Sequence, residues 1–462
     1  MFTPAIRCFF CAAGLLVGLV NPDLSGQEMS QDPGKLQQRS MASFKQGDYR
    51  SALAGYSILI EGDPGNAMYC YYAGICLVEM NEQLDEAIEY LYGASNHGVP
   101  EDVNYYLGKA YHQDYNFTDA QKYFGRFELS ANRQEIKEYN IKHLLNTCRS
   151  AREITSTYNP YEVMNVTFID LLDSAQFSQI RMKGGQLQRK PAAYFTADED
   201  RTDLNSLMFI PRSVARGNYA YYSGYARSGK EGAQLFRVRK GTARAWGDPE
   251  EIKELNSEGD EIMPYFDPIE NDLYFASNGR PGIGGFDLYR SHYDSQRDAW
   301  SPPINLGFPI NSVMDEYLLL PGSDLGMVMF FSTRQGTDST ITVYRIHLVE
   351  PKKKTVVNDN RMLKEIAYLG GAAADILTDM ESLTATGERP VSSAGQNARR
   401  EAPGRPDETV ITPVKILNGN SKGTVYQLAL ADALGHQSAS DSLKDLATAA
   451  RVRVRESDDP ND

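Results

Sequence analysis

The stretch Phe117-Thr-Asp-Ala120-Gln-Lys-Tyr-Phe124-Gly-Arg-Phe127 decides the fold of the first half of this chain. It places a small residue, Ala120, three residues after one aromatic side chain and four residues before another. On a helix these three side chains share one face. The small residue lets a second helix approach closely, and the large rings fill the space around the contact. The stretch therefore predicts one helix of a closely packed helical pair.

The same pattern occurs twice upstream, at nearly equal intervals. It is carried by Tyr49-Arg-Ser-Ala52-Leu-Ala-Gly-Tyr56 and by Leu84-Asp-Glu-Ala87-Ile-Glu-Tyr-Leu91, so the central alanines recur with a period of about 34 residues. The second unit carries one extra residue before Asn81, in the turn expected to join its two helices. A repeat of this period, built from helix pairs, predicts an α-helical solenoid over residues 34–155.

These repeats resemble the tetratricopeptide family, whose stacks bind peptides or partner proteins along a groove lined by the first helix of each pair. At equivalent positions of that groove the three units offer Gln37, Tyr71 and Tyr105. Lys109 and His112 follow on the third of these helices. Together, the rings and donors suit an acidic or carboxylate-ended partner segment. The alternative is that Tyr71 and Tyr105 pack between neighbouring repeats.

From residue 160 onward the hydrophobic pattern changes from a helical period to alternation. Leu273-Tyr-Phe-Ala-Ser277 and Phe286-Asp-Leu-Tyr-Arg290 flank a glycine-rich link and predict two paired strands. Aromatic residues recur at nearly equal intervals in two series, Tyr222, Phe275 and Phe331 in the first and Phe236, Tyr289 and Tyr344 in the second. Units of this length with short strands predict β-propeller blades over residues 160–349.

The stretch Leu273–Asn311 resembles the blades of WD-repeat-like periplasmic propellers, through its Ser-Asn-Gly-Arg and Gly-Gly-Phe-Asp-Leu-Tyr runs. Three such units are clear in the sequence, whereas a closed propeller needs about four blades or more. Either Val163–Asp200 supplies a diverged blade, or the sheet assembly stays partly open.

The two ends of the chain have a different composition. Arg7 precedes the apolar run Cys8–Val20, which is too short to cross a bilayer as a helix and suits a signal peptide of residues 1–26. Only two aromatic residues occur in residues 350–462, which predicts a largely disordered, low-complexity tail with short helices. The predicted fold class is therefore multidomain, α plus all-β: a helical solenoid, a propeller-like domain and this tail.

Charge and apolar content limit the partners and the location. The 462 residues include 47 Lys and Arg against 61 Asp and Glu, a formal net charge of −14. This acidity argues against nucleic-acid binding, which needs cations to neutralise phosphates. No later stretch is apolar enough to span a membrane, so we expect an exported protein without a transmembrane segment. The periplasm is the expected location, and peripheral association with the outer membrane stays open.

The sequence lacks the motifs of common catalytic sites. It contains no phosphate-binding loop, no nucleophile elbow and no His or Cys spacing typical of metal sites, so we expect no cofactor, metal or catalytic residue. A tetratricopeptide stack before such a propeller resembles envelope proteins of type IX secretion and gliding, here without a recognisable OmpA-like C-terminal domain. The resemblance implies a non-catalytic scaffold or adaptor for envelope proteins or peptide segments. The alternative is a glycan-binding protein or hydrolase that uses the central cleft of the propeller.

Overall fold

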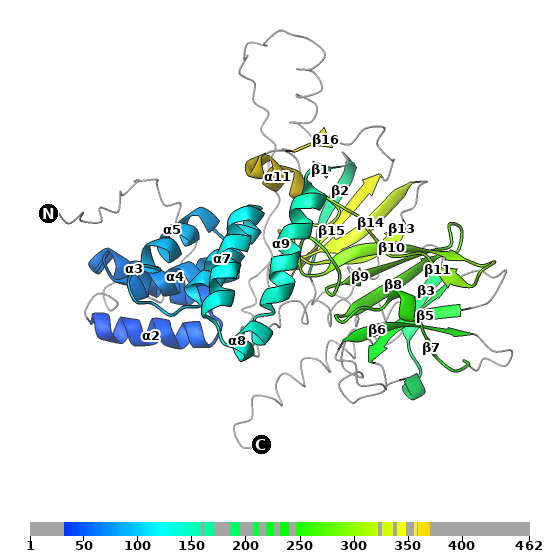
Figure 1. Cartoon of the computed structure of the whole chain (residues 1–462), viewed down its shortest axis with the longest axis horizontal. Coiled ribbons are helices and arrows are strands. Elements are labelled where there is room, and N and C mark those ends of the chain that lie inside the picture. Colours follow the sequence, from blue (N-terminus) through cyan, green and yellow to red (C-terminus); the bar gives the residue numbers. More distant parts are fainter. Residues whose placement is uncertain are drawn as a thin grey trace, which may run out of the picture.

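The computed structural model shows helices first and antiparallel sheets afterwards, so the fold is α plus β in chain order (Figure 1). It describes residues 32–158, 161–170, 185–194, 207–211, 219–225, 232–239, 246–321, 326–335, 340–347, 355–357 and 359–369. The predicted signal peptide and most of the predicted tail lie outside these residues.

Helices occupy the chain from Pro33 to Thr155. They are α2 (Pro33–Lys45), α3 (Tyr49–Gly62), α4 (Ala67–Met80), α5 (Leu84–Ala94), α6 (Val103–Gln113), α7 (Phe117–Ser130), α8 (Arg133–Glu138) and α9 (Ile141–Thr155). Five of these helices have an N-terminal cap, a side chain that accepts a hydrogen bond from a backbone N–H of the first turn. The capping residues are Asp32, Asp48, Asn66, Asn116 and Asn132. Consecutive helices are neighbours from α2 to α7, and α9 then packs on α7.

Small residues allow these helices to approach closely at regular intervals. The three alanines of the sequence pattern are fully buried: Ala52, Ala87 and Ala120. A Cβ atom added to Gly74 would lie 2.6 Å from Cγ of Leu91, and one added to Gly108 would lie 2.5 Å from Cδ1 of Phe124. Because both distances are too short for real atoms, each glycine is required for its helix contact. The same helix–helix contact therefore recurs in the next unit of the sequence pattern.

Within the described residues, three larger antiparallel sheets follow the helices. The first contains β3 (Gly185–Arg189), β4 (Leu207–Pro211), β5 (Tyr219–Tyr225), β6 (Ala233–Arg239) and β7 (Glu250–Glu251). The second contains β8 (Glu261–Asp267), β9 (Asp272–Ser277), β10 (Asp287–Asp294), β11 (Ala299–Trp300) and β12 (Ile304–Asn305). The third contains β13 (Glu316–Pro321), β14 (Met327–Ser332), β15 (Thr340–His347) and β2 (Glu162–Asp170). The first sheet packs on the second through β8, and the second packs on the third through β13.

Strand β2 belongs to the third sheet, although it precedes the first sheet in the chain. Ile169 of β2 lies opposite Ile341 of β15, and both side chains are buried. Strand β3 instead pairs with β4. The described part of Val163–Asp200 therefore forms no sheet of its own, so the first of the two alternatives, a diverged blade there, is wrong for these residues. The reason is that β2 pairs along its edge with β15, which places Ile169 on the buried face of the last sheet.

The aromatic residues of the two predicted series form one stacked cross-strand pair in each sheet. The pairs are Tyr222 with Phe236, Phe275 with Tyr289 and Phe330 with Tyr344, at ring-centroid distances of 5.3, 6.0 and 5.2 Å. The third member of the first series is thus Phe330 rather than the predicted Phe331. Phe331 lies opposite Val343, and its side chain points to the other face of the sheet. With this correction the two series have identical spacing along the chain.

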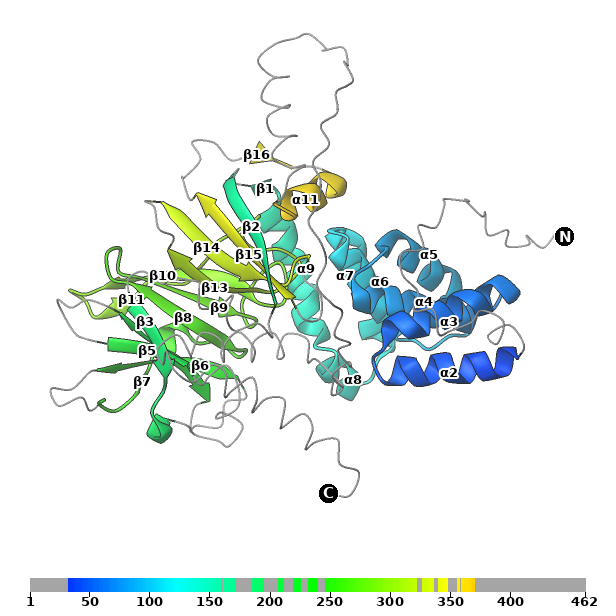
Figure 2. The same cartoon turned by 180° about the vertical axis from the view of Figure 1, so that it is seen from behind.

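A shared hydrophobic core joins the helices to the sheets. Phe117 of α7 and Tyr115 before it belong to the same buried cluster as Phe308, which follows β12. The helix α11 (Asn360–Ala367) adds Leu363 to this cluster. The short strands β1 (Thr157–Tyr158) and β16 (Thr355–Val356) pair with each other beside α9 and α11. Figures 1 and 2 show α9 between the other helices and the sheets.

Candidate functional site

A cavity of about 180 Å³ lies where three parts of the chain meet. The turn between α4 and α5 and the turn between α6 and α7 form one side. The loop before β13 and the residues after β14 form a second side, and α11 forms the third. The polar residues that line it include Asn81, Gln83, Gln113, Asp114, Arg334 and Lys364. Segments far apart in the sequence therefore share one small polar site.

Four residues that line the cavity have a left-handed backbone conformation without being glycine. They are Asn81, Gln83, Tyr115 and Gln335, with φ angles of 54°, 46°, 59° and 56°. Such backbone conformations cost roughly 1–3 kcal/mol each and persist where the surrounding structure fixes them. Asn81 and Gln83 lie in the turn that carries the extra residue of the second repeat. Strained residues that gather around one cavity are typical of binding sites.

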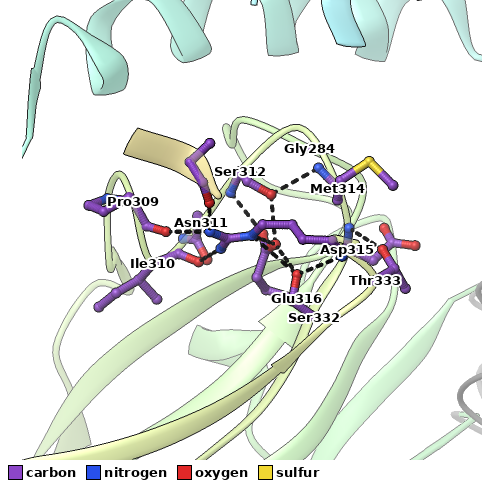
Figure 3. Close-up of polar contacts among 12 residues, drawn as sticks. Gly284, Pro309, Ile310, Asn311, Ser312, Met314, Asp315, Glu316, Ser332 and Thr333 are labelled. Atoms are coloured by element: carbon purple, nitrogen blue, oxygen red, sulfur yellow. Dashed lines mark hydrogen bonds and ion pairs between the residues drawn. The ribbon is translucent and has the colours of Figure 1, made fainter. Parts of the chain in front are cut away.

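The wall formed by the third sheet contains a buried ion pair between Arg334 and Glu316. Arg334 Nε donates to Glu316 Oε1 at 3.1 Å, and Arg334 is 2% exposed. Figure 3 shows the side chains of Ser312 and Ser332 converging on Glu316. Ser312 donates to it from Oγ at 2.7 Å and from the backbone N–H at 2.8 Å, and Ser332 Oγ donates at 2.9 Å. Burial raises the pKa of the Glu316 carboxyl, and the Arg334 charge opposes this effect.

The same arginine holds α11 in place. Its Nη1 donates to the carbonyl oxygen of Ala367 at 2.6 Å, which satisfies a carbonyl at the C-terminal end of the helix. It also donates to Pro309 at 2.9 Å and to the carbonyl of Ile310. On the opposite side, Lys364 of α11 forms an ion pair with Asp114 of the helical region. Helix α11 is thus fixed to both other walls of the cavity.

Three side-chain oxygens of residues that line the cavity have no hydrogen-bond partner among the described residues. They are Oδ1 of Asn81, Oε1 of Gln113 and Oδ1 of Asp114, all shielded from bulk solvent, and the Asp114 oxygen is in the ion pair with Lys364. The amide nitrogen of Asn81 makes only a weak contact, 3.6 Å to the sulfur of Met314. Buried polar atoms are almost always hydrogen-bonded, so unpaired acceptors beside a cavity are groups that a bound water, ion or ligand donor would satisfy.

The structure separates the five residues that the sequence assigned to a groove. Gln37 is exposed on α2. Tyr71 is 4% exposed, and its hydroxyl donates to Asp102 at 2.6 Å. Tyr105 is partly buried, with its ring centroid 4.5 Å from that of Tyr139. These positions agree with the alternative in which the two tyrosines pack between neighbouring helices.

Lys109 and His112 point to different surroundings. Lys109 Nζ forms an ion pair with Glu79 of α4 at 2.7 Å. His112 is 8% exposed and faces the sheets, where it hydrogen-bonds with the backbone of Ile283. Burial lowers the pKa of His112 to about 4, although this hydrogen bond opposes the shift. His112 is therefore a neutral residue of the interface between helices and sheets, and it cannot serve as an exposed positive donor near neutral pH.

Sequence reasoning missed the cavity itself. One signal was visible: the extra residue before Asn81 marks an irregular turn in an otherwise regular repeat. Nothing in the sequence shows that this turn faces Arg334, because the contact depends on how the last sheet docks on the helices.

No protein-family model matches the chain, and no curated protein matches it either. In the part of the chain that the structure describes, no group of three or more His, Cys, Asp or Glu side chains could hold a metal ion. Nor does any described helix have the length and apolar character needed to cross a membrane.

Proposed function

We propose that this protein is a non-catalytic adaptor of the cell envelope that binds a segment of a partner protein at the cavity. In this proposal the helices form a tetratricopeptide-type stack and the sheets form a propeller-like domain. The chain is exported to the periplasm, where it tethers envelope proteins as the type IX secretion and gliding components that it resembles do.

The observation that carries the proposal is the convergence of walls from three separate parts of the chain beside two unpaired amide oxygens, Asn81 Oδ1 and Gln113 Oε1. A partner group that enters the cavity contacts the helical turns, the third sheet and α11 at once. One bound group therefore contacts the helices, the sheets and α11 together, which suits an adaptor. The hydrophobic core shared by helices and sheets supports this use, because it holds the walls together before the partner arrives.

The proposal moves the partner contact away from the face of the first helices. Tyr71 and His112 are buried and already have partners in the fold. Tyr105, Lys109 and Gln37 stay predicted partner contacts, as the alternative to binding at the cavity.

The experiment that tests this function is affinity capture from a membrane extract with the full chain, identified by mass spectrometry. The affinity of the captured protein is then measured for two variants with the same substitution. Leu84→Trp fills the cavity, which Leu84 lines, whereas Leu129→Trp changes a side chain that is 90% exposed on α7. We expect Leu84→Trp to weaken binding at least about tenfold, or about 1.4 kcal/mol, and Leu129→Trp to leave it unchanged. Equal affinities, or saccharide turnover in place of a protein partner, would contradict the proposal.

A further inference from the structure

We infer that the cavity takes one positively charged side chain of the partner, a lysine or an arginine. This inference rests on the proposed function, because it names the chemistry of the partner group at the same site. It follows from three features of the cavity: the cations that are already paired, the acceptors that are left unpaired, and the small volume.

The cations of the wall are already neutralised by the protein. Arg334 is paired with Glu316, and its remaining donors go to backbone carbonyls. Lys364 is paired with Asp114. Neither cation is therefore free to attract an acidic partner group, and the cavity has no net positive charge to offer an anion.

The groups that are left over are acceptors. No donor from the described residues reaches Asn81 Oδ1 or Gln113 Oε1, and the exposed carboxylate of Asp85 lines the same cavity. Helix α5 begins here, and its positive end is offset by Asp85 and Glu86 in its first turn. A ligand that carries several N–H donors and a positive charge satisfies both amide oxygens and the carboxylate.

The size of the cavity limits the ligand to a single side chain. Its volume of about 180 Å³ is below the roughly 300–1,000 Å³ of pockets that take drug-sized ligands. This room fits the flexible stem and head of one lysine or arginine, and it excludes a folded element. The mixed walls also suit such a side chain, since Leu84, Val313 and Ala367 provide apolar contacts for its stem.

The test uses n-butylammonium chloride as a mimic of the lysine side chain, titrated into the full chain and followed by NMR at constant ionic strength. Butyrate and 1-butanol are the anionic and neutral probes of similar size. We expect saturable binding of butylammonium with Kd of about 1–10 mM, in line with a ligand of five heavy atoms. Butyrate and 1-butanol should bind at least about fivefold more weakly.

Substitutions of Gln113, and of Gln37 as a control outside the cavity, show whether butylammonium binds at the cavity. Gln113→Met removes an unpaired acceptor and should weaken butylammonium binding at least about fivefold. Gln113→Glu adds a carboxylate and should tighten it. Gln37→Met, on the exposed face of α2, should change nothing.

Each other outcome overturns the inference. Equal or tighter binding of butyrate shows an anion site, equal binding of 1-butanol shows an apolar site, and an unchanged Gln113→Met affinity places the amine elsewhere. The result is also independent of partner capture. If a partner binds at the cavity while butylammonium does not, the inference fails and the adaptor proposal stands. If butylammonium binds and no partner is captured, the cation site stands and the adaptor proposal fails.

Discussion

The second and third sheets contain the same polar network, with different consequences for the molecule. The second-sheet network consists of Ser257, Glu261, Ser277 and Arg280, and the third-sheet network consists of Ser312, Glu316, Ser332 and Arg334. In each, the glutamate accepts from two serine hydroxyls and from a backbone N–H four residues earlier. The same sequence interval separates the two glutamates and each pair of corresponding serines.

The arginines differ. Arg280 Nε lies 3.7 Å from Glu261 Oε1, beyond hydrogen-bond distance, and its side chain is 18% exposed. Arg334 donates to Glu316 at 3.1 Å and also to the carbonyls of three residues, including Ala367 of α11. Both sheets thus share the serine–glutamate arrangement. In the third sheet its arginine also holds α11 and one wall of the cavity.

The largest expected effect comes from breaking the two networks at the same position. Arg334→Met leaves Glu316 as an unpaired buried charge and releases α11, so we expect a loss of about 3–5 kcal/mol in the free energy of unfolding. Arg280→Met removes a longer and more exposed contact and should cost only about 1–2 kcal/mol. Urea unfolding of both full-length variants measures the difference. Equal losses would remove the distinction between the networks.

A second prediction concerns the contact between the second sheet and the helices, where His112 meets Ile283. The pKa of His112 is lowered to about 4 from an ordinary value of about 6.5. The unfolded chain therefore binds a proton below pH 6.5 while the folded chain does not. His112 should cost up to about 3 kcal/mol of stability as the pH falls from 6.5 to 4, and nothing above 6.5.

The measurement is the free energy of unfolding against pH for the parent, His112→Gln and His97→Gln, whose histidine is exposed. Asp287 also titrates in this pH range, and it changes the stability in the opposite direction. The difference in stability between parent and variant is therefore needed to isolate the contribution of His112. Burial raises the pKa of Asp287 to about 7, so its contribution to stability increases as the pH falls below that value. The hypothesis is wrong if His112→Gln loses as much free energy of unfolding as the parent when the pH falls from 6.5 to 4.

A smaller effect sharpens the role of α11. Lys364→Met breaks the ion pair with Asp114, whose side chain is only 15% exposed, and should cost about 1 kcal/mol. The matched variant Lys122→Met breaks an exposed pair with Asp119 within α7 and should cost less than about 0.5 kcal/mol. Hydrogen exchange should increase in α11 for the first variant alone. Unchanged exchange there would show that Arg334 holds the helix by itself.

The sequence predicted the parts of this fold that depend on local spacing. The close packing around Ala120, between Phe117 and Phe124, follows from the size and spacing of residues in one short segment, and all three are buried. The spacing predicted Phe331 where the structure has Phe330. A one-residue change of register exchanges the faces of a strand, so approximate spacing could not separate these two neighbours. The cavity was missed for a different reason: Asn81 and Arg334 meet only after the last sheet has docked on the helices.

The central claim is that a partner binds at the cavity rather than on the face of the first helices. It is tested most directly by photo-crosslinking, with p-benzoylphenylalanine at Leu84, which lines the cavity, or at Gln37, which is exposed on α2. The account predicts a crosslink to the captured partner from position 84 and none from position 37. A crosslink from position 37 without one from position 84 would contradict it.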